Sequence, residues 1–189
     1  PFMARRVSIP SFTFFICLLC AAYIPFRDAG SSLFYSLGIY AEKWMFNASL
    51  FYICAFAMNS VYGARIACGL LFAGAYSLLL VRYVKTKDPS AHMLYYCLFL
   101  VFGATVMVSP VVHPWYVCWI VPFLVVYPRL SWIVLTGTVF LSYYVLKQYT
   151  ETGVWAESPA VTFMVYAPFY GILLYELLSK KYTGQTCPT

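Results

Sequence analysis

The run from Ser109 to Pro122 is where residues able to do chemistry concentrate. It combines the imidazole of His113 with the amphipathic rings of Trp115 and Tyr116, at a point where one apolar run ends and another begins. Its prolines lack a backbone N–H and disfavour helix in the preceding residue, so the chain is expected to turn or unwind here. Inside a membrane, irregular backbone is tolerated only where protein buries it or where it lines a wet cavity. We therefore expect His113, Trp115 and Tyr116 to line a cavity.

A second informative stretch carries Glu42, Trp44 and Asn47. Rings that stack on the C–H faces of a sugar, beside side chains that bond its hydroxyls, are what a carbohydrate site needs. A donor such as His113 or Arg65 can hold a phosphate through charge-assisted hydrogen bonds. The sequence therefore makes these five residues candidates for binding a sugar or a phosphate.

Each of these residues also has a purely structural interpretation. A single histidine at a helix end is often only hydrogen-bonded, and tryptophans such as Trp44 and Trp115 commonly anchor a protein at the membrane surface. Glu42 adjoins Lys43, and an exposed pair of this kind contributes little. Asn47-Ala-Ser49 also matches an N-glycosylation acceptor, a pattern that is common by chance.

The composition is that of an integral membrane protein. The chain of 189 residues is 63% hydrophobic and 10% charged, with a mean hydropathy of +0.78, whereas soluble domains carry about 25% charged residues. The net charge of +6 is therefore interpreted as an excess of Lys and Arg that sets the orientation of the chain in the membrane. No nucleic-acid partner is expected. Most of the seven cysteines lie in apolar segments as packing residues, and no metal site is expected.

Apolar runs predict an all-α polytopic helical bundle of about six spans plus an interfacial helix. Residues 27–65 are expected to form an outer loop and a short interfacial helix, and residues 179–189 a cytoplasmic tail, within one domain over residues 1–189. The predicted spans are Val7–Phe26, Ile66–Val84, Met93–Val112, Trp115–Tyr127, Leu130–Leu146 and Ala160–Leu178.

The segment Trp115–Tyr127 leaves two topologies open. It is too short for an ordinary span and contains Pro122, so it is either a kinked crossing or a re-entrant hairpin. A crossing gathers most Lys and Arg residues on one side, whereas re-entry divides them almost evenly. The tendency of cytoplasmic loops to be positive favours the crossing. Both ends of the chain are then cytoplasmic, and Glu42 and His113 share the outer face.

The pattern S-P-x-x-H-P-W-Y-x-x-W-x-x-P, which begins at Ser109, resembles the late motif of bacterial GT-C glycosyltransferases. These multi-spanning enzymes include polyprenyl-phosphate-dependent mannosyltransferases. The pattern Y-A-E-K-W-x-F-N-A-S, which begins at Tyr40, is similar to an outer-loop motif of the same group, and residues 141–177 resemble its C-terminal segment. The likeness is strongest to uncharacterised members of Bacteroidetes type and covers nearly the whole chain.

The resemblance implies transfer of a hexose, with mannose the first candidate, from a polyprenyl-phosphate sugar to a glycan or glycolipid hydroxyl. The membrane would be a bacterial inner membrane, and the lipid-linked donor is a substrate; no cofactor is identified. His113, Trp115 and Tyr116 would line the donor headgroup site, and Trp44 and Asn47 would position sugar or acceptor. Glu42 would be the local proton acceptor.

The resemblance further implies that part of the enzyme lies outside this chain. Such enzymes have eight or more spans and a catalytic carboxylate in the first outer loop, so we expect this chain to be the C-terminal part and the usual base to lie upstream of Pro1. Two other classes stay open, a transporter or channel subunit and a non-catalytic membrane partner. The scarcity of polar residues at the middle of the spans disfavours a transporter.

Overall fold

The computed structural model describes residues 9–179, and its elements are helices joined by loops. The start of the first predicted span at Val7 and most of the tail expected at 179–189 lie outside the described residues. The described chain divides into two compact units, with the boundary between Trp44 and Met45. The single domain expected over residues 1–189 stays a prediction.

The first unit contains α1 (Ile9–Tyr23), a 3₁₀ helix (Ile24–Ala29) and α2 (Ser32–Lys43). Residues 9–29 are long and apolar enough to cross a membrane, as expected for the first span. Within residues 27–65, where the sequence predicts an outer loop and a short interfacial helix, α2 occupies Ser32–Lys43. Gly38 lies inside α2 and does not break it, since one glycine costs a helix only about 1 kcal/mol.

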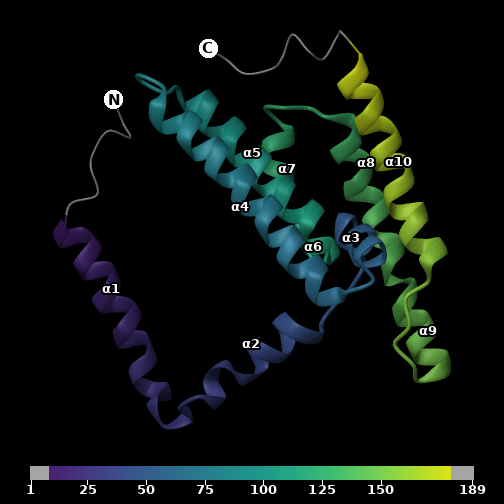
Figure 1. The fold of residues 1–189 in the computed structure, drawn as a ribbon, viewed down its shortest axis with the longest axis horizontal. Coiled ribbons are helices and arrows are strands. Elements are labelled where there is room, and N and C mark those ends of the chain that lie inside the picture. Colours follow the sequence, from purple (N-terminus) through teal and green to yellow (C-terminus); the bar gives the residue numbers. More distant parts are fainter. Residues whose placement is uncertain (1–8, 180–189) are drawn as a thin grey trace. The chain divides into compact units, whose positions relative to one another are not determined.

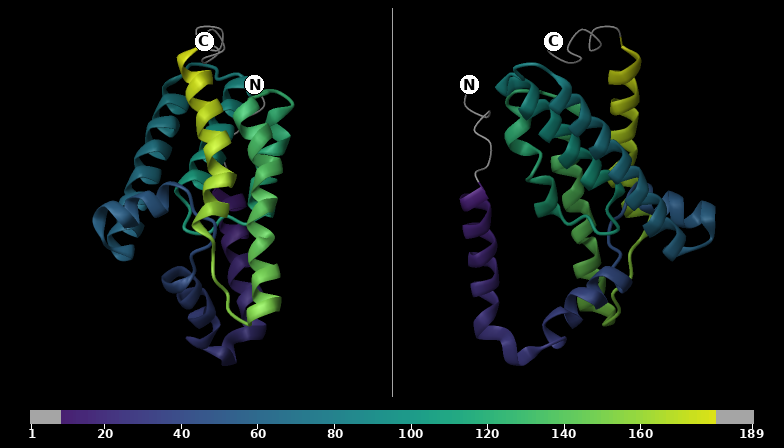
Figure 2. Two further views of the ribbon diagram at one scale, coloured as in Figure 1. Left: turned by 90° about the vertical axis from the view of Figure 1, so that its right-hand side faces the viewer. Right: turned by 60° about the vertical axis from the view of Figure 1, so that its left-hand side comes forward.

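The second unit is a set of antiparallel helices (Figure 1). Helices α4 and α5 lie side by side, and so do α8 and α10 (Figure 2). Serines 60 and 90 cap α4 and α5, because each Oγ accepts the backbone N–H three residues later. The elements are α3 (Leu50–Met58), α4 (Val61–Lys85), α5 (Ala91–Val108), α6 (Pro114–Val117), α7 (Val121–Leu124), α8 (Leu130–Thr138), a 3₁₀ helix (Val139–Tyr143), α9 (Tyr144–Thr152) and α10 (Pro159–Leu178).

Five helical stretches among the described residues are long and apolar enough to span a membrane, so the protein is a helical membrane protein. Trp115–Tyr127, the fourth of the six predicted spans, is not among them. Its backbone forms the one-turn helices α6 and α7, which begin at or beside the prolines expected to interrupt it. The five stretches are Ile9–Ala29, Val61–Lys85, Ala91–Val108, Leu130–Thr152 and Pro159–Leu178.

Although it is broken, the segment after α6 runs back along α5 towards its N-terminus. The ring of Trp119 lies 6.2 Å from Phe102, between ring centroids. Further along, Tyr127 packs against the ring of Phe99 at 5.9 Å, and its hydroxyl donates to the carbonyl of His92 at 2.7 Å. The segment therefore covers nearly the whole length of α5 and ends beside its first turn.

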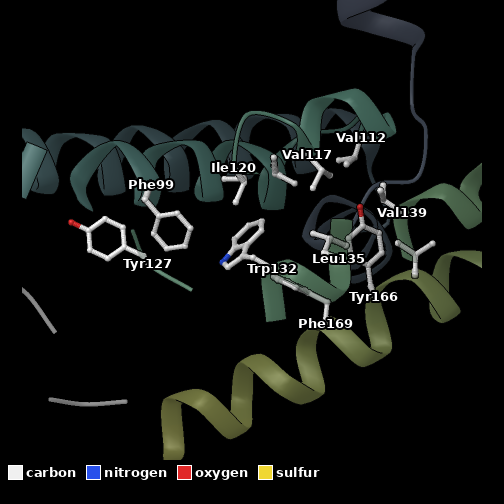
Figure 3. Packing of buried hydrophobic residues seen from close by; sticks show 12 residues of the cluster. Phe99, Val112, Val117, Ile120, Tyr127, Trp132, Leu135, Val139, Tyr166 and Phe169 are labelled. Atoms are coloured by element: carbon white, nitrogen blue, oxygen red, sulfur yellow. The ribbon is translucent and has the colours of Figure 1, made fainter. Parts of the chain in front are cut away.

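The core of the second unit lies where α5, α8 and α10 meet (Figure 3). Trp132 of α8 contacts Phe99 of α5 edge-on at 6.1 Å and Phe169 of α10 at 5.0 Å. The absence of a side chain at Gly103 lets this indole approach α5, since a Cβ there would lie 2.9 Å from its ring. The fully buried Leu135 and Val139 extend this core towards α9.

A buried carboxylate ties the end of α10 to the start of α8. Glu176 is only 3% exposed and accepts hydrogen bonds from the backbone N–H of Leu130 and the hydroxyl of Ser131, both at 2.7 Å. A carboxylate at a helix N-terminus satisfies an otherwise unpaired N–H and complements the helix dipole. This contact and the Tyr127–His92 bond place the loop between α4 and α5, the start of α8 and the end of α10 at one end of the unit.

Candidate functional site

At the opposite end of the second unit, two segments far apart in the sequence pair directly. Phe46 donates its N–H to the carbonyl of Pro110 at 2.9 Å, and Val112 donates to the carbonyl of Phe46 at 2.8 Å. The two segments thus form an isolated parallel bridge between Phe46 and Val111. The break after α5 supplies the free backbone groups for this pairing, because α5 ends at Val108. We call the contact between residues 45–49, 109–113 and 153–158 the outer junction, after the membrane face that the sequence predicts for it.

Asn47 is the centre of the outer junction. It is 2% exposed and holds a positive φ of 46°, a conformation that Asn adopts more readily than most residues. Its side-chain amide donates to the carbonyl of Val112 at 3.2 Å, and its own carbonyl accepts from the hydroxyl of Tyr166 at 2.7 Å. Its Oδ1 atom is buried and has no hydrogen-bond partner. Because the side chain is buried, the glycosylation motif at Asn47 is not accessible in this fold.

Glu157, in the loop before α10, connects the 153–158 segment to the 45–49 segment within the outer junction. One carboxylate oxygen accepts the backbone N–H of Asn47 at 2.6 Å, and the other accepts the hydroxyl of Tyr52 at 2.9 Å. Burial raises the pKa of Glu157, and the two hydrogen bonds oppose that rise only in part. Burial and the neighbouring Glu157 charge raise the pKa of Tyr52, so its hydroxyl remains a donor.

His113 is half-buried between two rings. It stacks on Trp115 with ring centroids 4.1 Å apart and an angle of 12°, and its other neighbour is Phe46 at 4.7 Å. Burial lowers the pKa of His113, which favours the neutral ring. Its Nδ1 is buried without a partner. A buried N–H without an acceptor is costly, so the proton of the neutral ring belongs on Nε2. His113 is thus suited to donate one hydrogen bond from Nε2.

Aromatic rings continue from His113 in both directions. Tyr116 meets His113 edge-on at 5.7 Å and stacks on Trp119 at 5.0 Å. On the other side, Trp155 packs against Phe46 at 5.7 Å. Trp115 and Trp155 are about half exposed, at 52% and 48%, so their rings are available to a ligand. Half-exposed indoles beside a hydrogen-bond donor are suited to hold a sugar ring.

The structure brings together four of the seven residues predicted from sequence, namely Asn47, His113, Trp115 and Tyr116. Glu42 and Trp44 belong to the first unit, where both are exposed at the end of α2 and Tyr40 contacts the Trp44 ring at 5.4 Å. Arg65, in the first turns of α4, lies 5.6 Å from the ring centre of Phe51. The roles assigned to these residues stay predictions.

Glu157 is the junction residue that sequence reasoning did not select. The predicted topology placed both Glu151 and Glu157 on the same face as His113, and that was the available signal. The two differ only in the folded chain, since Glu151 is exposed and lies 3.8 Å from Lys147, one helical turn away. No spacing pattern distinguishes a carboxylate that bonds Asn47 and Tyr52 from one that faces solvent.

Two cavities adjoin these elements. A small one of about 10 Å³ lies against Asn47 and Glu157 and is lined by Ser142, Ser158 and Thr162, among others. A larger one, of about 440 Å³, is almost wholly apolar and lies between α4, α5, α8 and α10. Among the residues lining it, Met107 belongs to the last turn of α5, just before the 109–113 segment.

No protein-family model matches this chain, and neither the curated proteins nor the solved structures contain a match to it. The chemistry open to the site therefore follows from its own residues. These are a neutral imidazole donor, exposed indoles and a half-buried carboxylate at one end of a helical membrane unit. Over residues 9–179, no three His, Cys, Asp or Glu side chains gather as a metal cluster.

Proposed function

We propose that this chain belongs to a GT-C-like glycosyltransferase. It transfers a hexose, with mannose the first candidate, from a polyprenyl-phosphate sugar to an acceptor hydroxyl on the outer face. The observation that carries the proposal is the bridge between Phe46 and Val111. It joins the two segments whose motifs resemble this family, so that Asn47 and His113 belong to one site.

In this proposal His113 binds the donor headgroup. A neutral Nε2–H donor beside an indole can bond a phosphate or ring oxygen while the sugar face lies on Trp115 or Tyr116. Such a donor stabilises the charge that develops on the leaving lipid phosphate. Glu42, as proton acceptor, and Trp44 keep the roles toward sugar and acceptor that the resemblance implies. Arg65 offers a cation for the phosphate, in addition to the neutral donor of His113.

The apolar cavity between α4, α5, α8 and α10 supports a lipid-linked donor. Its volume of about 440 Å³ is enough for a segment of an isoprenoid or acyl chain, and its lining carries almost no polar surface. It reaches the last turn of α5 at Met107, directly before the segment that carries His113. A prenyl chain in this cavity would leave its phosphate near the outer junction.

The proposal also includes a sixth crossing, formed by the broken segment from Trp115 to Tyr127. Because Tyr127 bonds the carbonyl of His92, the chain has returned to the end of α5 opposite His113. A re-entrant hairpin would instead leave Tyr127 beside the outer junction. The backbone of this segment is irregular, which a membrane tolerates where protein covers it.

Cysteine labelling tests this crossing. Single cysteines replace Asp88 in the α4–α5 loop, Arg129 after the broken segment and Thr152 at the end of α9, in a background without native cysteines. We expect a membrane-impermeant maleimide added outside spheroplasts to label position 152 and to spare 88 and 129. Labelling of position 129 alone would mean that the segment re-enters, and labelling of 88 and 129 but not 152 would reverse the orientation.

A transfer assay tests the function itself. The full gene product that contains these residues is expressed in membranes and given polyprenyl-phosphate mannose labelled in the sugar. We expect label to appear in a glycan or glycolipid fraction, with polyprenyl phosphate released in equal amount, and no transfer from a nucleotide sugar alone. Uptake of labelled sugar into vesicles without any transfer product would instead favour the transporter alternative.

A further inference from the structure

The small cavity beside Asn47 is rich in hydrogen-bond acceptors. Asn47 Oδ1 is buried and unpaired, although the other polar groups of this residue are bonded. The hydroxyl of Ser142, which is 5% exposed, donates its hydrogen to the carbonyl of Val139 at 2.7 Å. Its oxygen therefore has lone pairs to offer but no hydrogen. A group that bridges these oxygens must bring positive charge or hydrogen atoms.

The cavity also holds an uncompensated charge. Glu157 lines it, and both partners of the carboxylate, the Asn47 N–H and the Tyr52 hydroxyl, are neutral. Two ion pairs in the described part of the chain are Arg27 with Asp28 and Lys147 with Glu151, and neither involves Glu157. A half-buried carboxylate without a cation is costly. A water molecule can donate to Asn47 Oδ1 but cannot offset this charge.

We propose that this cavity binds one monovalent cation, Na⁺, held by oxygen atoms of Glu157, Asn47 and Ser142. The volume of about 10 Å³ has room for a single water-sized species and no more. Ser158 and Thr162 line the same cavity and offer further oxygens. Hard cations select oxygen ligands of this kind, namely carboxylate, amide carbonyl and hydroxyl.

The charge of the ligands favours a monovalent ion over Ca²⁺ or Mg²⁺. Glu157 is the only acidic residue lining the cavity, so Na⁺ gives a neutral site whereas a divalent ion leaves excess charge. Mg²⁺ also retains several waters, for which the cavity lacks space. The bound ion would join the 45–49 segment to the 153–158 segment, and Na⁺ would therefore stabilise the outer junction.

Thermal unfolding in detergent, followed by tryptophan fluorescence, tests the site without any enzyme assay. Na⁺ is raised at constant ionic strength with choline as the replacement ion. We expect Tm to rise by about 3–5 °C for each tenfold increase in Na⁺ above its Kd, because the ion binds only the folded chain. The same Tm in Na⁺ and in choline would overturn the proposal and leave water in the cavity. A larger rise with Ca²⁺ than with Na⁺ would overturn the choice of ion.

Two matched variants locate the effect. Glu157→Gln keeps the size of the side chain but removes its charge, and we expect it to abolish the dependence of Tm on Na⁺. Glu151→Gln removes an exposed carboxylate from α9 and should keep the full dependence. If both variants respond to Na⁺ like the parent, the cation binds elsewhere. If Glu157→Gln fails to fold, the ²³Na NMR linewidth of NaCl with the unmodified protein decides, since exchange with a bound site broadens the line relative to NaCl in the same detergent without protein. An unchanged linewidth would overturn the proposal.

Discussion

His113→Ala is expected to reduce transfer from polyprenyl-phosphate mannose by about 10²–10³-fold, the usual effect of removing one donor to a developing charge. The physical reason is the tautomer that the fold imposes. His113 Nδ1 is buried without a partner and burial lowers the pKa of the ring, so the neutral ring donates from Nε2. Alanine removes that donor and the surface that stacks on Trp115. The measurement is the rate of labelled product at saturating donor, in the full gene product.

A conservative variant and a matched control separate this role from folding. His113→Gln retains a neutral N–H donor at a similar reach, and we expect it to recover part of the lost rate. His92→Ala removes the other histidine, which contacts Tyr127 at the opposite end of the unit, and its transfer rate should remain near that of the parent. Equal rates for the parent and His113→Ala, with Tm unchanged, would exclude His113 from the site.

The parts of the fold that sequence predicts are those set by local composition. Apolar length predicts the long helices, and the prolines at 110 and 114 predict the break that frees backbone groups for the outer junction. The predicted alternation of the chain across the membrane also places residues 45–49, 109–113 and 153–158 at one end, and their hydrogen bonds bear this out.

What the sequence does not predict depends on contacts between distant residues. The broken segment covers the length of α5 without forming one long helix. The role of Asn47 in positioning sugar or acceptor stays a prediction, but no local pattern predicts that its side chain is buried and bonds the carbonyl of Val112. The role of Glu157 depends on a partner 110 residues away in the chain, which no local pattern reveals.

Asn47→Ala is expected to lower the free energy of unfolding by about 2–4 kcal/mol. Two costs contribute to this value. Alanine leaves the buried carbonyl of Val112 without its donor, and it must adopt the positive φ of 46°, which Asn tolerates better. With choline in place of Na⁺, loss of the unpaired Oδ1 offsets a small part of this cost. The measurement is equilibrium unfolding in mixed micelles. The slope of the unfolding free energy against denaturant concentration should be the same for every variant, so that the free energies can be compared.

Replacing Asn47 by glycine and by aspartate separates these two costs. Glycine also lacks the side-chain donor but adopts positive φ freely, so we expect Asn47→Gly to lose about 1 kcal/mol less than Asn47→Ala. Aspartate retains the shape but sets a carboxylate oxygen against the carbonyl of Val112 and brings a second charge beside Glu157, so it should cost the most. An alanine variant as stable as the parent would mean that the amide does not hold the two segments together. Because the backbone N–H of Asn47 also binds Glu157, a change that shifts this backbone loosens the segments carrying His113 and Trp155 together.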